Sequence, residues 1–391
     1  MKSFSLGAVI GGGAMFFLCA ALLLTTAWMM NQHKVASGPA PEFCPLVGDK
    51  NVTALLKPIR QKFNVPAMAV AVVTSTGIKF IGAVGVRKRG TEISVALDDL
   101  WHLGSDGKIM TSTLMARLVE RGQLRWDTTL GEVFPELAPQ MDEGFRNVSL
   151  LHLLSHRAGL PANLNLTKFS GDDAPQLRLR AVKEELAKKL QFAPGEKFLY
   201  SNLGYIIAAA VVEKTTGKAW EQAIAEEVFN PLQMNSAGFG GTGTPGKIDQ
   251  PWPHTKDGEP TSANGPAIDN PPVMGSAGRI HCTIQDWAKF IQDQLRGARS
   301  EPALLKPESY QKLQTQSFGG DYALGWIVAE RGWGGGKVLN HGGDNTMNCA
   351  NVWVAPKKDF AILVCVNQGG DTAFQASDAA VGVMIDLLQK K

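Results

Sequence analysis

A serine and a lysine stand three residues apart in the stretch HLGSDGKIMTSTL, where Ser105 and Lys108 open an apolar segment with helical spacing. Residues three apart on a helix share one face. A serine hydroxyl becomes a nucleophile when a partner takes its proton, and a lysine can do this if burial lowers its pKa. Free N–H groups at a helix N-terminus can also bind a developing oxyanion. The stretch therefore indicates an acylation site, although the spacing alone also fits a capping serine and a solvated lysine.

Two further stretches supply groups for the same chemistry. In FLYSNLGY, Tyr200 and Asn202 point the same way if the segment is extended. A tyrosine there could accept a proton, and an asparagine could bind a substrate amide. In VLNHGGDN, His341 and Gly343 lie on the edge of an expected strand, where glycines let a substrate lie against the backbone. A backbone N–H just beyond these glycines could complete an oxyanion hole with that of Ser105.

The motifs SxxK, YxN and HxG, in this order, resemble those of the serine β-lactamase-related family. This family contains class C β-lactamases, penicillin-binding DD-peptidases, and related esterases and amidases. The stretches LVERGQLRWDTTLGEVFP, LLHLLSHRAGLP, FAPGEKFLYSN and GSAGRIHCTIQDWAKF also resemble family segments. The resemblance implies a serine hydrolase that forms an acyl-enzyme on an ester, amide, β-lactam or D-amino-acid peptide, with no metal and no cofactor.

The resemblance also implies a role for each matching residue. Ser105 is the nucleophile that is acylated, and Lys108 beside it tunes or relays the proton. Tyr200 is the general base of acylation and activates water for deacylation. Asn202 binds the amide side of the substrate. The backbone N–H groups of Ser105 and Asp344 form the oxyanion hole.

One substrate-binding position departs from the pattern of lactamases and peptidases. His341, followed by Gly343, stands where those enzymes carry the lysine of a KTG motif. A histidine is neutral or only partly charged near neutral pH, so it is a weaker clamp for a substrate carboxylate. We therefore expect an esterase, amidase or peptidase rather than an efficient β-lactamase. The alternative is a sensor of penicillin or peptidoglycan that is acylated without turnover.

The sequence patterns of the strands and helices that must position these residues predict an α+β fold. Valine-rich and alternating apolar runs predict strands over 67–74, 78–86, 322–329, 338–340, 350–354 and 360–366. Helical spacing predicts helices over 52–63, 106–120, 174–190, 203–229, 284–295 and 374–389. We expect one antiparallel sheet built from both ends of the chain and flanked by the first and last helices. An all-helical insertion over about residues 125–275 would interrupt a catalytic domain formed by residues 51–391.

The first residues have a different composition. No charged residue occurs over 4–30, and Lys2 precedes this run. The segment fits either a cleaved signal peptide or a membrane anchor that is retained. The proline-containing stretch 31–50 then reads as a linker. Either reading predicts that the catalytic domain is extracytoplasmic, that is, periplasmic or secreted. It would contact the membrane through this segment if the segment is not cleaved.

Composition limits the remaining partners. A net charge of +3 over 391 residues gives no reason to expect nucleic-acid binding, so the expected partner is a small molecule or a peptide. The chain has five cysteines and no CxxC pair, which argues against a zinc site. Cys349 and Cys365 are expected as buried strand residues. The oligomeric state does not follow from the sequence.

Overall fold

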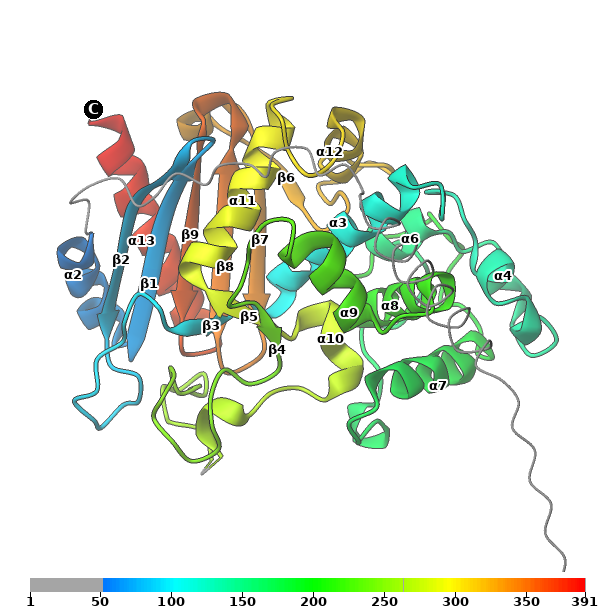
Figure 1. Ribbon diagram of the computed structural model, residues 1–391, viewed down its shortest axis with the longest axis horizontal. Helices are drawn as coiled ribbons and strands as arrows, with labels where there is room; N and C mark the ends of the chain where they lie inside the picture. The colour runs from blue at the N-terminus through cyan, green and yellow to red at the C-terminus, as the bar shows by residue number, and fades with distance from the viewer. Residues whose placement is uncertain (1–51, 263, 391) are drawn as a thin grey trace, which may run out of the picture. The chain divides into compact units, whose positions relative to one another are not determined.

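A six-stranded antiparallel sheet is the main framework of the computed structural model, which describes residues 52–262 and 264–390 (Figure 1). Its strand order is β2-β1-β9-β8-β7-β6. The strands are β1 (Ala67–Thr74), β2 (Gly77–Gly85), β6 (Ile327–Arg331), β7 (Gly336–Asp344), β8 (Cys349–Ala355) and β9 (Phe360–Val366). Pairing of β1 with β9 joins the first two strands to the last four, which confirms the prediction of a sheet built from both ends of the chain.

Both faces of this sheet are covered by helices. The central strand β9, with the sequence FAILVCV, is buried along its whole length, which explains why its residues do not alternate between apolar and polar. Helix α11 (Ile284–Ala298) packs on one face, while α2 (Thr53–Phe63) and α13 (Asp371–Gln389) pack on the other (Figure 1). Two apolar clusters result, one on each side of the sheet.

The remaining helices form the region beside the sheet. They are α3 (Gly107–Glu120), α4 (Leu130–Val133), α5 (Glu143–Arg146), α6 (Leu150–Leu154), α7 (Ala174–Leu186), α8 (Asn202–Thr216), α9 (Trp220–Ile224), α10 (Gly275–Gly278) and α12 (Pro307–Leu313). Helix α3 is buried on nearly all sides, because α8, α9, α10 and α12 all contact it. Helix α3 therefore lies in the interior of the described part of the chain. Its packing on these helices fixes the position of its first turn.

The helical insertion is confirmed, but it ends earlier than expected. A short π-helical segment closes it at Phe229, and the glycine- and proline-rich residues that follow are mostly irregular. Where the structure describes them, they contain only β4 (Gly238–Phe239) and short 3-10 turns before α10. Strand β4 joins β3 (Leu100–His102) and β5 (Ile280–Thr283) in a small second sheet that the sequence did not predict.

Two strand boundaries also differ from expectation. The predicted strand over 322–329 begins only at Ile327, because Gly325, with φ of +90°, turns the chain before it. Strand β7 is longer than predicted and carries both His341 and Gly343 within its ladder to β8. Its pairing with β6 ends at Asn340, so the last residues of β7 have an open edge on that side.

The expectations for the first 50 residues, a leader and a linker, lie outside the described residues. Within 52–262 and 264–390, none of the helices combines the length and the apolar character needed to cross a membrane. Cys282, Cys349 and Cys365 are free and buried, and the latter two lie in β8 and β9 as expected.

Candidate active site

A sharp turn presents Ser105 between β3 and α3. Residues Gly104–Asp106 form a 3-10 turn, and Gly104 has a φ of +51°, which favours glycine. A Cβ on Gly104 would lie 2.8 Å from the backbone nitrogen of Asp344. A Cβ on Gly343 would lie 2.0 Å from the carbonyl oxygen of Leu103 and 2.8 Å from the backbone nitrogen of Ser105. The turn therefore packs directly on the open edge of β7, and the two glycines bring the amides of Ser105 and Asp344 together.

The amine of Lys108 lies beside the serine hydroxyl. Its Nζ is 2.9 Å from Ser105 Oγ, 2.7 Å from Asn202 Oδ1 and 2.5 Å from the carbonyl oxygen of Ala277. Burial lowers the pKa of Lys108 to about 7, although the nearby Asp106 acts in the opposite direction. The carbonyl and amide oxygens can only accept hydrogen bonds. A neutral amine would donate its two N–H groups to them and direct its lone pair at Ser105.

Asn202 begins α8 and lies between the lysine and the helical region. Its Oδ1 accepts from Lys108, and its Nδ2 donates to Asn163 Oδ1 at 2.7 Å. Ser201 caps the helix by accepting from the backbone N–H of Gly204 at 3.1 Å. One N–H of the Asn202 amide remains beyond these two bonds, so the side chain can still donate to a substrate.

Tyr200 is held against the lysine by His156. The Lys108 Nζ lies 4.9 Å from the centre of the Tyr200 ring, and the His156 ring lies 4.2 Å from it. His156 binds the backbone on both sides of the tyrosine: its carbonyl accepts from Leu199 at 2.9 Å, and its Nδ1 accepts from Ser201 at 3.0 Å. Burial raises the pKa of Tyr200 above its usual value, although its hydrogen bond with Ser105 acts in the opposite direction.

His341 lies close to the 3-10 turn that carries Ser105 but is closed off from solvent. Only 3 % of its surface is exposed, and both ring nitrogens have partners. Nδ1 lies 3.0 Å from Asp106 Oδ1, and Nε2 lies 3.1 Å from the hydroxyl of Tyr322. Burial, followed by the charge of Lys108, lowers the pKa of His341 to about 3. The ring is therefore neutral at physiological pH.

A cavity of about 480 Å³ opens at Ser105. Asn202 and Asp344 line it, together with four further asparagines: Asn163, Asn165, Asn270 and Asn345. No lysine, arginine or histidine is among the described residues that line it. The carboxylate of Asp344 is already bound by the backbone N–H groups of Thr346 and Gly370. The cavity thus offers amide groups and two convergent backbone amides, but no cation.

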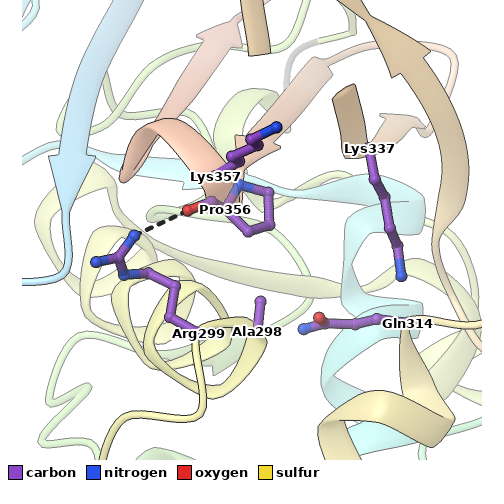
Figure 2. Close-up of a pocket in the computed structure, with 6 residues that line it drawn as sticks. All are labelled: Ala298, Arg299, Gln314, Lys337, Pro356 and Lys357. Atoms are coloured by element: carbon purple, nitrogen blue, oxygen red, sulfur yellow. Dashed lines mark hydrogen bonds between the residues drawn. The ribbon is translucent and has the colours of Figure 1, made fainter. Parts of the chain in front are cut away.

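A second hollow, of about 470 Å³, lies at the C-terminal end of α11 (Figure 2). Arg299 donates to the carbonyl oxygen of Pro356 at 3.0 Å, and Lys337 reaches toward Gln314. Ala298 and Lys357 complete its lining. These residues include no serine, threonine or cysteine, so this hollow lacks the hydroxyl or thiol that acyl transfer of the expected kind needs.

The comparisons with known proteins agree with this geometry. The family model described as Beta-lactamase matches residues 52–383. The chain belongs to the beta-lactamase family. This membership confirms the expectation of a serine hydrolase, and the α+β architecture is that of the family's solved structures.

Three individual proteins illustrate the likeness. Penicillin-binding protein 4 of Amycolatopsis lactamdurans is 28 % identical over 340 residues, which cover 81 % of this chain and 84 % of that protein. Esterase EstB of Burkholderia gladioli is 32 % identical over 183 residues, covering 44 % of this chain and 46 % of the esterase. The penicillin binding protein from Bacillus halodurans superposes with a TM-score of 0.67 at 23 % identity, covering 84 % of this chain and 98 % of that one.

The structure brings the predicted residues of this family member together and adds others. Asp106 and Tyr322 hold His341, and His156 holds Tyr200, as described above. Asp106 gave one signal in the sequence, since it is an acidic residue inside the SxxK motif. His156 lies in the stretch LLHLLSHRAGLP, which resembles a family segment, but nothing in that stretch indicates its contact with Tyr200. Tyr322 gave no signal, because its partner lies outside its own segment.

Proposed function

We propose that the chain is an extracytoplasmic hydrolase that is acylated at Ser105 and acts on uncharged esters or amides, including peptides. The observation that carries the proposal is the distance of 2.9 Å between Ser105 Oγ and Lys108 Nζ. The two other partners of this amine only accept hydrogen bonds, so its neutral form has a lone pair for the serine proton.

The proposed reaction has two halves. The Ser105 oxygen bonds to the substrate carbonyl carbon while its proton moves to Lys108, and the amides of Ser105 and Asp344 bind the oxyanion. The bond to the leaving group then breaks, and the leaving group takes a proton from Tyr200, which Lys108 restores. Water repeats the sequence on the acyl-enzyme. Because burial raises its pKa, the Tyr200 phenol is protonated at neutral pH, so it transfers a proton rather than acting as a phenolate base.

The lining of the cavity favours an uncharged substrate. His341, which stands at the position of a carboxylate-binding lysine, is buried, neutral and bonded through both nitrogens. A substrate carboxylate would lose its hydration without gaining a cation, which is unfavourable. Four of the asparagine side chains instead match the carbonyl and N–H groups of neutral esters, amides and peptides: Asn163, Asn165, Asn202 and Asn270.

The relatives and the first residues support the rest of the proposal. One relative is an esterase and another a penicillin-binding protein, which are the two kinds of substrate chemistry that we consider for this chain. The uncharged run over 4–30 supports an exported or anchored protein. A penicillin sensor without turnover stays the second candidate, because such a protein needs the same acylation geometry.

The test uses two aryl acetates that differ only in the leaving group, which carries a carboxylate in one and its methyl ester in the other. We expect steady turnover of both, with a kcat/KM at least about tenfold higher for the methyl ester, since an unpaired buried charge costs more than 1.4 kcal/mol. Ser105→Ala should abolish turnover and the mass increase with a fluorophosphonate probe. A preference for the carboxylate would refute the neutral substrate class, and a single burst without turnover would favour the sensor.

A further inference from the structure

Asp269 is a buried carboxylate next to the cavity that the reaction does not use directly. Its side chain is 1 % exposed and lies in the irregular segment before α10. It accepts hydrogen bonds from three segments: His102 Nε2 at 3.0 Å, Arg279 Nε at 3.2 Å and Asn345 Nδ2 at 3.2 Å. Burial alone would raise the pKa of Asp269, but His102 and Arg279 hold it below its usual value, so the group is ionised.

The hydrogen bond with His102 links Asp269 to the turn that carries Ser105. His102 Nδ1 accepts from the backbone N–H of Gly104 at 3.1 Å, so this nitrogen carries no proton. The ring proton must then be on Nε2, where it is donated to Asp269. The chain of bonds from Asp269 through His102 thus ends on the residue just before Ser105. Replacing the carboxylate would free the ring to rotate or change tautomer, and the bond to Gly104 would weaken.

The hydrogen bond with Asn345 links Asp269 to the segment that carries the Asp344 amide, the second proposed donor of the oxyanion hole. Asn345 follows Asp344, and its Oδ1 accepts from the backbone N–H groups of Met347 at 3.2 Å and Asn348 at 2.8 Å. This side chain therefore holds the turn that leaves β7. Its amide has only one orientation in which Oδ1 meets these donors and Nδ2 meets Asp269.

We propose that Asp269 is a positioning residue that aligns both donors of the oxyanion hole, through His102 on the Ser105 side and through Asn345 on the Asp344 side. The inference rests on the proposed function, because it assigns these two amides to the oxyanion. Two donors on separate elements must be fixed relative to each other for electrostatic stabilisation to be preorganised. Asp269 is bonded to both elements at once and does not itself line the cavity.

The first experiment compares Asp269→Asn with Arg279→Lys, a control that removes the Nε–H bond to the same carboxylate but keeps the positive charge that holds Asp269 ionised. We expect Asp269→Asn to lower kcat on the neutral aryl acetate by about 10- to 1000-fold with little change in KM, since a lost oxyanion donor acts on the transition state. Arg279→Lys should change kcat less than about threefold. Equal losses in both variants, or an unchanged kcat in Asp269→Asn, would overturn the proposal.

The second experiment needs no variant. In wild-type protein with ¹⁵N-labelled histidine rings, the His102 signals should show a protonated Nε2 and an unprotonated Nδ1 at neutral pH. The opposite tautomer would overturn the proposal even if Asp269→Asn failed to fold. Fluorophosphonate labelling of Ser105 with steady turnover, but with a normal kcat in Asp269→Asn, would refute this inference and leave the proposed function standing.

Discussion

Lys108 has a polar environment in an otherwise apolar interior. The helix that carries it is buried on nearly all sides, yet three oxygen atoms surround its amine. Burial disfavours the charged form, and the hydrogen bonds keep the amine solvated by protein atoms. The residue can therefore change its charge near neutral pH without leaving its position.

This environment predicts a pH dependence. Since the pKa of Lys108 is about 7, the neutral form becomes dominant above that pH. The rate of Ser105 acylation should fall about tenfold per pH unit below 7 and level off about one unit above it. Stopped-flow acylation at substrate concentrations well below KM measures it. Lys108→Arg, which stays protonated, should be inactive throughout, and a wild-type rate independent of pH between 5 and 8 would contradict this role.

The residues that the sequence predicted for the site lie in or beside short motifs. The residue types and the spacing within each motif indicate a chemical role. The supporting residues could not be predicted in this way. Asp269 approaches His102 and Asn345 only after the chain has folded, and an aspartate in a proline-rich loop looks like a surface turn. Their function depends on tertiary contacts that local spacing does not record.

At the scale of elements, the site depends on the contact between β7 and the 3-10 turn that carries Ser105, Gly104–Asp106. In the proposed mechanism, neither element alone forms the oxyanion hole, because each supplies one of its two amides. The contact is so close that two glycines face each other across it, Gly104 and Gly343. This packing explains Gly343 without any contact to substrate.

Gly343→Ala should separate the two elements. The added Cβ would lie 2.0 Å from the Leu103 carbonyl oxygen, so the turn must move. We expect the acylation rate to fall by about 10²- to 10³-fold, as for a lost oxyanion donor. Gly382→Ala is the control, because Gly382 is exposed in α13 with nothing within 4 Å. It should leave the rate unchanged and raise the free energy of unfolding by about 0.5–1 kcal/mol. Normal acylation in Gly343→Ala would show that this contact is dispensable.

The elements that were predicted well are those with long, unambiguous patterns. Strands β1 and β9 are continuous apolar runs, and α13 has helical spacing over most of its 19 residues. The small sheet was missed because β3, β4 and β5 have only two to four residues each, too few to show any period. Its pairing is set by long-range contacts, since β3 and β5 are far apart in the sequence.

At the scale of the whole molecule, the described part of the chain is stabilised without disulfides. Three cysteines are free thiols: Cys349 and Cys365 lie in the six-stranded sheet, and Cys282 lies in the small sheet. Burial raises the pKa of each. A buried thiol with a raised pKa is unreactive. These three residues therefore report on the integrity of the fold.

The expected result is a difference between native and unfolded protein. With iodoacetamide at pH 8, peptides that contain these three cysteines should stay unmodified in the native protein and be fully alkylated in denaturant. Mass spectrometry compares the native and the denatured protein separately at each of the three positions. Cys19 and Cys44 lie outside the described residues and are not used as reference sites. Rapid alkylation of any of them in the native state would show that its strand opens.

The pairing of the first strands with the last has a consequence for biosynthesis. The proposed nucleophile, Ser105, leaves the ribosome early, whereas β7, which carries the second proposed oxyanion amide, is made much later. A nascent or truncated chain therefore holds the attacking serine without the means to stabilise the charge it would create. In the proposed mechanism, hydrolytic competence therefore arrives only after β7 has been made and has packed against the turn that carries Ser105.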